Sequence, residues 1–193
     1  MCIRDSWYKM HWFEMAARVP LLVHAPARFA AHRVSQSVST VDLLPTLVEL
    51  AGGQVEPGLA LDGRSLLPHL QGNGGHDEVL GEYMAEGTTS PLMMIRRGEW
   101  KFVYSEEDPL LLFNVANDPQ ERENLATSPD HREQLEAFLA EARSRWDMTA
   151  IHAATLASQR RRRLVAEALT QGKLKSWDCL LYTSPSPRDL STS

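Results

Sequence analysis

Histidine and cysteine, the side chains that most often bind transition metals or act as nucleophiles, are poorly spaced for such roles in this sequence. Cys2 and Cys179 stand near the two ends, so the central chain offers no disulfide framework and no cysteine-based metal site. The histidines lack the H-x-x-x-H spacing of a paired site, and hard cations prefer oxygen ligands. We therefore interpret His11, His24, His69 and His76 as structural or surface residues, and predict no metal ligands in the chain.

Two other features suggest binding but favour structural roles. Arg160–Arg163 is a run of four basic residues within a predicted helix, where consecutive residues point to all sides. No interleaved aromatics accompany this run, so we expect it to pair with carboxylates of a neighbouring helix or subunit and not with nucleic acid. Trp100 and Tyr104 lie on the same face of a predicted strand, where packing is their expected role.

The composition is that of an ordinary globular protein. The 193 residues are 43% hydrophobic and 23% charged, with a formal net charge of -5. This mild charge suggests neither a nucleic-acid nor a membrane partner, and no apolar run approaches the roughly 20 residues that would span a bilayer. The length allows one medium domain or parts of two.

Both ends of the chain have an unusual composition. Residues 1–6 read MCIRDS and residues 179–193 read CLLYTSPSPRDLSTS, and both resemble translated sequencing-adapter read-through. A natural Ser- and Pro-rich tail is the alternative for the second stretch. We interpret both as artefact sequence and expect the informative chain to run from Trp7 to Asp178.

The first half predicts a strand followed by a helix, which is typical of α/β proteins. Residues 19–23 form an apolar run between prolines and predict a buried strand of a parallel sheet. Residues 39–53 predict a helix with Asp42 as its N-cap, and Gly52 and Gly53 at its end. Residues 54–77 are rich in Gly and Pro and predict a connection over the surface.

The second half predicts a small antiparallel sheet and two helices. Strands are expected at residues 79–84, 92–96, 100–104 and 110–114, and Arg97-Gly98-Glu99 predicts a tight hairpin turn. Ser128 and Pro129 predict a helix start, followed by apolar residues on one face at Leu135, Phe138, Leu139, Ala142 and Trp146. A second helix is expected over residues 151–169, with Gly172 as its stop.

The order of these motifs resembles the sulfatase family of the alkaline-phosphatase-like superfamily. The matching segments are residues 7–9, 18–23, 41–47, 50–52, 61–67, 100–104, 118–121 and 124–125. Longer stretches are similar to the choline-sulfatase subfamily, namely residues 76–87, 90–97, 157–165 and 177–178. The resemblance implies that residues 7–73 complete the large α/β domain and that residues 74–178 form a C-terminal subdomain of small antiparallel sheet and helices.

The resemblance also implies a cofactor chemistry that lies elsewhere in the parent enzyme. Family members carry a Cys in a C-x-[PA]-x-R motif, which is matured to the formylglycine nucleophile, and a divalent cation, usually calcium. Neither Cys2 nor Cys179 fits that motif, and the calcium ligands are not expected in this chain. We therefore predict that the chain alone is inactive and folds poorly, since its parallel strand would lack neighbours.

The site residues expected from the resemblance are Lys9, Glu86 and Glu82. Lys9 matches a lysine that touches the sulfate, where an ammonium would stabilise developing negative charge. Glu86, and less strongly Glu82, would face the quaternary ammonium of choline-O-sulfate. This group has no N–H to donate, so it is bound by aromatic faces and by the charge of nearby carboxylates. The alternative for all three is an ordinary solvated charge.

The expected function is hydrolysis of choline-O-sulfate to choline and sulfate by a cytoplasmic parent enzyme that forms a homo-oligomer. One alternative is another superfamily member, an arylsulfatase or a phosphonate monoester hydrolase, whose site would carry other substrate-facing groups. A second is a non-catalytic module for oligomer contacts or for covering the substrate.

Overall fold

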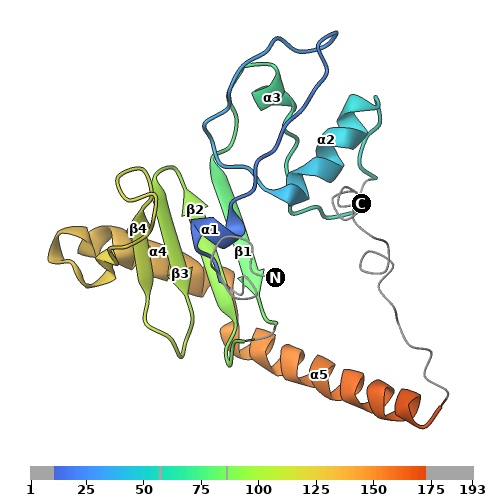
Figure 1. Ribbon diagram of the computed structural model, residues 1–193, viewed down its shortest axis with the longest axis vertical. Helices are drawn as coiled ribbons and strands as arrows, with labels where there is room; N and C mark the ends of the chain where they lie inside the picture. Colours follow the sequence, from blue (N-terminus) through green and yellow to red (C-terminus); the bar gives the residue numbers. More distant parts are fainter. Residues whose placement is uncertain (1–10, 57, 86, 173–193) are drawn as a thin grey trace, which may run out of the picture. The chain divides into compact units, whose positions relative to one another are not determined.

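The computed structural model describes residues 11–56, 58–85 and 87–172. The chain divides into two compact units, residues 1–152 and residues 153–193. The first unit contains all four strands and most of the helices, which Figure 1 labels. Lys9 and Glu86 lie outside the described residues.

A four-stranded antiparallel sheet with the order β1-β2-β3-β4 forms the centre of the first unit. Its strands are β1 (Glu78–Tyr83), β2 (Leu92–Arg97), β3 (Trp100–Tyr104) and β4 (Leu111–Asn114). β2 and β3 are joined by the predicted hairpin, in which Arg97 pairs with Trp100 and Gly98 takes a positive φ of 55°. The predicted sheet is therefore confirmed, with strand ends shifted by about one residue.

One face of the sheet packs against α4 (Arg132–Arg145), as Figure 1 shows. Alternate strand residues point toward this helix because successive side chains on a strand face opposite ways. The helix start at Ser128 and Pro129 is confirmed, since Ser128 is the N-cap residue of the short 3-10 helix η3 (Pro129–His131) that leads into α4, although its side chain makes no capping hydrogen bond. The buried core of this face consists of Met93, Ile95, Phe102, Tyr104, Leu112, Phe138, Ala142, Trp146 and Met148.

The helix predicted over residues 39–53 forms with a different cap from the one expected. A 3-10 turn η1 (Thr40–Asp42) precedes α2 (Leu43–Leu50), and Ser39 is the N-cap. The Ser39 side chain accepts from Val41 N, while Asp42 Oδ2 accepts from Ser39 N at 2.8 Å, so the two residues form a reciprocal capping box. Asp42 stands directly before α2, at the predicted N-cap position, but its carboxylate does not cap that helix and accepts from Ser39 N instead. Gly52 follows the end of the helix with φ 75°.

The parallel strand predicted at residues 19–23 is not formed. These residues have no assigned strand, and Val19, Leu21, Leu22 and Val23 are 46% to 91% exposed. A parallel strand needs neighbouring strands as hydrogen-bond partners. The four described strands pair antiparallel with one another, and none of them pairs with residues 19–23. Three short elements complete the first unit: α1 (Glu14–Ala17), α3 (Leu67–Leu70) and the 3-10 helix η2 (Leu125–Thr127).

The described part of the second unit is helical. It belongs to α5 (Met148–Thr170), which confirms the predicted second helix, and Gly172 N bonds to Leu169 O just after its end. Arg160–Arg163 are exposed, as are Leu156, Leu164, Val165 and Leu169. A search of the described residues finds no helix that is both long and apolar enough to cross a membrane.

Candidate functional site

The face of the sheet opposite α4 is covered by the short segment Trp12–Glu14, which begins three residues after Lys9 in the sequence. Met94, Val103 and Phe113 on this face are at most 5% exposed. The ring centroids of Phe13 and Phe113 lie 5.9 Å apart. The segment therefore covers the apolar face of the sheet that α4 does not contact, although its residues are far from the strands in sequence.

Lys101, in the middle of β3, points into this covered face and is buried with its charge. Its side chain is 1% exposed. The ammonium Nζ lies 2.8 Å from Trp12 O, 2.6 Å from Glu14 Oε1 and 2.8 Å from Glu121 Oε1. The ammonium donates a hydrogen bond to Trp12 O and forms ion pairs with Glu14 and Glu121, while the buried Glu121 Oε1 has no hydrogen-bond partner among the described residues. A buried charge of this kind is tolerated only when it is paired and hydrogen-bonded.

Glu121 completes the network from the turn that follows β4. Its side chain is 2% exposed, and its Oε2 accepts from Glu14 N at 2.5 Å. Its backbone takes φ 54°, the left-handed region that a residue with a Cβ adopts only at a cost. Asp118 shapes this turn by accepting from Arg122 N and Glu123 N, and those backbone hydrogen bonds lower the pKa of its carboxyl.

Trp12 fixes the same segment to β1 and β2. Its Nε1 donates to Leu92 O at 3.0 Å, and its ring meets Tyr83 edge-on with centroids 6.4 Å apart. Gly81 lies directly beneath the indole, since a Cβ placed there would be 2.7 Å from Cη2. A glycine is therefore required at position 81 by the close approach of the ring, not by its backbone conformation.

His11 lies next to this network but is not one of the hydrogen-bond acceptors of Lys101. Its Nδ1 accepts from Phe13 N at 3.1 Å, and its ring contacts Phe13 edge-on. Burial lowers the pKa of His11, an effect that Glu121 opposes and Lys101 reinforces. The residue therefore favours the neutral form.

Glu82 lies on the other face of the sheet. Its Oε1 accepts from Trp146 Nε1 at 2.7 Å, which ties the edge strand β1 to the end of α4. Tyr83, its neighbour, faces Trp12 on the covered side. Of the three residues expected to contact substrate, the structure describes only Glu82, and it places that carboxylate away from the segment that follows Lys9.

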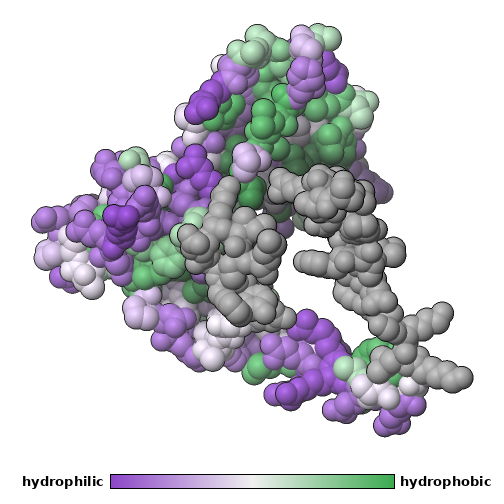
Figure 2. Space-filling view, in the orientation of Figure 1, coloured by the Kyte–Doolittle hydropathy of each residue, from purple (hydrophilic) through white to green (hydrophobic). Residues whose placement is uncertain are grey.

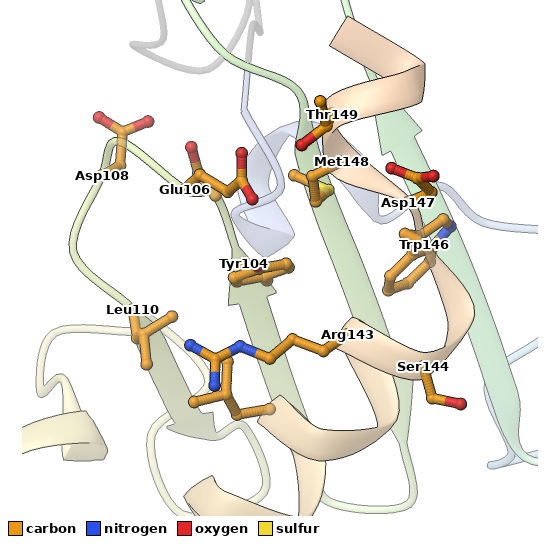
Figure 3. Close-up of a pocket in the computed structure, with 12 residues that line it drawn as sticks. Tyr104, Glu106, Asp108, Leu110, Arg143, Ser144, Trp146, Asp147, Met148 and Thr149 are labelled. Atoms are coloured by element: carbon orange, nitrogen blue, oxygen red, sulfur yellow. The ribbon is translucent and has the colours of Figure 1, made fainter.

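A cavity of about 830 Å³ opens beside Trp146 (Figure 3). Tyr104 presents its ring to this cavity, while Glu106 and Asp108 extend from the β3–β4 loop and Asp147 from the α4–α5 connection. Aromatic rings and carboxylates together are suited to an organic cation. All three carboxylates are exposed, however, and Glu82, the predicted site residue that the structure describes, does not line this cavity.

Of the four histidines considered above, His11, His69 and His76 contact other side chains of the first unit, and His24 is exposed. His76 Nε2 lies 3.0 Å from Asp42 Oδ2, and His69 is 2% exposed and packs edge-on against His76. Burial opposes ionisation of Asp42, but hydrogen bonds from Arg64 N, Ser39 N and His76 outweigh it and lower its pKa. Between residues 11 and 172, leaving aside 57 and 86, no three His, Cys, Asp or Glu side chains are grouped to hold a metal ion.

The Lys101 network was missed by sequence reasoning, although one signal was available. The strand Trp100–Tyr104 is apolar apart from Lys101, whose neighbours Phe102 and Val103 are both core residues. A lysine at a position that alternation assigns to a buried face indicates a paired internal charge. Its partners could not be found in this way, because Glu14 and Trp12 lie more than 80 residues away in sequence.

Comparison with known proteins places the chain within a family. A sequence model described as N-sulphoglucosamine sulphohydrolase, C-terminal, matches residues 5–145, and one described as choline sulfatase enzyme C terminal matches residues 153–186. Choline-sulfatase from Rhizobium meliloti is 41% identical over 179 residues, which are 91% of this chain and 35% of that protein. Human arylsulfatase K is 34% identical over 63% of this chain and 24% of its own length.

Among solved structures, the phosphonate monoester hydrolase from Silicibacter pomeroyi is similar with a TM-score of 0.59. It shares 26% identity, over 71% of this chain and 30% of the other. The comparisons confirm the predicted α/β fold class and the sulfatase resemblance. The chain spans about a third or less of the length of these relatives.

Proposed function

Because this chain belongs to the sulfatase family, we propose that the full-length protein hydrolyses choline-O-sulfate to choline and sulfate. The S–O bond of the ester breaks, water supplies the oxygen that leaves in sulfate, and one proton is released. The observation that carries this proposal is the 41% identity to a choline-sulfatase over 91% of the chain. In this proposal the calcium ligands and the cysteine that is matured to formylglycine belong to other parts of the full-length protein, since the described residues include no group of three His, Cys, Asp or Glu that could hold a metal ion.

In this proposal, Lys9 contacts the sulfate group. Cleavage places negative charge on the leaving oxygen and the sulfate oxygens, and a fixed ammonium stabilises that charge more in the transition state than in the substrate. The support from the structure is the firm attachment of the following segment, Trp12–Glu14, to the sheet. Loss of this ammonium would slow hydrolysis of every sulfate ester.

Glu86 is the carboxylate that we propose to face the trimethylammonium group of the substrate. Glu82 is the weaker candidate of the two, because its carboxylate already accepts from Trp146 on the α4 side of the sheet. A quaternary ammonium offers no N–H, so a nearby carboxylate attracts it by charge alone. Removal of that charge would therefore raise KM for choline-O-sulfate and leave KM for an aryl sulfate, which has no ammonium group, unchanged.

The test compares choline-O-sulfate with an aryl sulfate in the full-length enzyme and in three variants. We expect Lys9→Ala to lower kcat for both esters about a hundredfold. Glu86→Gln should raise KM about tenfold for choline-O-sulfate only, which corresponds to the loss of one charge contact of about 1.4 kcal/mol. Glu82→Gln tests the weaker candidate in the same way, and its amide oxygen can still accept from Trp146. The isolated 193-residue chain should release no sulfate.

Equal use of both esters, with Glu86→Gln silent, would leave a general sulfatase and remove the choline assignment. Preference for a phosphonate monoester would instead favour the alternative that the similarity to the phosphonate monoester hydrolase raises. We also propose that the enzyme is cytoplasmic and acts as a homo-oligomer. The exposed Leu164, Val165 and Leu169 of α5 support oligomer contacts, and equally suit the non-catalytic module.

A further inference from the structure

Lys101 is a buried charge for which stability gives no sufficient reason. Replacing a buried ion pair with well-packed apolar residues is often neutral or stabilising, whereas a network of paired charges fixes one arrangement of its parts. Lys101 lies in β3 between core residues, where an apolar side chain would fit the strand pattern. We therefore expect the charge of Lys101 to fix the position of the groups that its ammonium contacts.

The groups held by Lys101 belong to the segment that follows Lys9. Its ammonium donates to the carbonyl of Trp12 and forms ion pairs with the carboxylates of Glu14 and Glu121. Glu121 in turn accepts from the backbone N–H of Glu14. Both ends of Trp12–Glu14 are therefore attached to the sheet unit. A stretch of three residues spans at most about 11 Å, so fixing Trp12 restricts the volume that the Lys9 backbone can occupy.

We propose that Lys101 is a positioning residue for sulfate-ester cleavage. It holds Trp12–Glu14 in a fixed position on the sheet and thereby places Lys9 at the sulfate. This inference rests on the proposed function of Lys9. Trp12 extends the same attachment to β1 through Gly81, and that strand ends at Tyr83, three residues before Glu86. The Trp12–Glu14 segment, which follows Lys9 in the sequence, therefore contacts β1, the strand that precedes Glu86.

The experiment removes the ammonium together with the charge of its most buried partner, while Glu14, whose side chain is 18% exposed, keeps its carboxylate. In the full-length enzyme, Lys101→Met/Glu121→Gln deletes the ammonium and neutralises its most buried partner, and the Gln oxygen can still accept from Glu14 N. Arg97→Met/Glu141→Gln is the matched control, because it removes an ion pair from the opposite face of the same sheet. Thermal midpoints, kcat and KM are measured for choline-O-sulfate and an aryl sulfate.

We expect the Lys101→Met/Glu121→Gln enzyme to fold and to lose between about tenfold and a hundredfold in kcat for both esters, with KM changed less than threefold. The control pair should retain the wild-type kcat. A folded Lys101→Met/Glu121→Gln enzyme with the wild-type kcat would overturn the proposal. If this variant does not fold, Glu14→Gln takes its place, since the Glu14 side chain is 18% exposed at the edge of the network.

A double-mutant cycle with Lys9→Ala separates positioning from a general loss of structure. If Lys101 acts through Lys9, its removal in the Lys9→Ala background should cost less than about threefold in kcat. An equal loss in both backgrounds would overturn the inference while leaving the catalytic role of Lys9 intact. Failure of the proposed function looks different, because Lys9→Ala itself would then be silent, and that result would reject both.

Discussion

Gly81 shows how a single residue can set the position of a distant segment. Because a Cβ at this position would lie 2.7 Å from Trp12 Cη2, Gly81→Ala forces the indole to move. We expect a destabilisation of about 1–3 kcal/mol, typical of an overpacked interior. The free energy of unfolding in urea, measured on the full-length enzyme, checks this expectation.

Trp12→Phe provides the control for this prediction. Phenylalanine lacks the outer ring atoms that the new methyl group would meet, so Gly81→Ala should cost less in the Trp12→Phe background. The same destabilisation in both backgrounds would show that the substitution acts on β1 itself. Gly98→Ala offers a second comparison, since there the space is open and only the positive φ opposes a side chain.

At the scale of elements, α4 is attached to the sheet by an ion-pair network with a defined pH dependence. Arg97 donates to both oxygens of Glu141, and it also bonds to Glu78. The hydrogen bond from Arg97, with a smaller contribution from Arg145, lowers the pKa of Glu141 from 4.5 to about 2. The stability from this carboxylate is therefore present above about pH 4.5 and is lost as the pH falls toward 2.

Hydrogen exchange of the α4 amides between pH 5 and pH 2.5 tests this prediction. Protection should decrease across the window in the wild type, and Glu141→Gln should make the decrease shallower. Glu136→Gln is the control, because the Arg132–Glu136 pair on the same helix is largely exposed and contributes little. An identical pH dependence in the Glu141→Gln variant would contradict the role of this pair.

The elements themselves could be predicted where local signals decide them. The β2–β3 hairpin follows from a glycine turn and the helix start from the Ser128–Pro129 pair, and the structure has both elements. The strand at residues 19–23 could not be judged locally, because a strand depends on partners elsewhere. The Lys101 network escaped for the same reason, since Glu14 and Glu121 are 107 residues apart.

At the scale of the whole molecule, several large apolar side chains of the first unit are exposed. Leu22 is 91% exposed, Val19 64%, Leu47 63% and Leu44 54%. Figure 2 shows hydrophobic residues gathered over α2. We expect the isolated chain to associate as its concentration rises, in line with the predicted poor folding of the chain alone.

Sedimentation velocity at several concentrations tests this expectation. Leu22→Ser/Leu47→Ser should reduce association, because it removes two of the most exposed apolar side chains of the first unit. Leu164→Ser is the matched change on α5, where the residue is 68% exposed. If Leu164→Ser alone abolished association, the contact would belong to α5, and a monomer at all concentrations would reject the expectation altogether.

The sequence separation within the Lys101 network has a consequence for the order of folding. During synthesis, Glu14 leaves the ribosome about 5 to 20 seconds before Glu121, at the usual rate of elongation. The hairpins of the sheet close over short loops and can form early, whereas closing a loop of this length is slow. We therefore expect docking of Trp12–Glu14 to be a late event, so that a nascent chain would form its sheet before this segment docks on it.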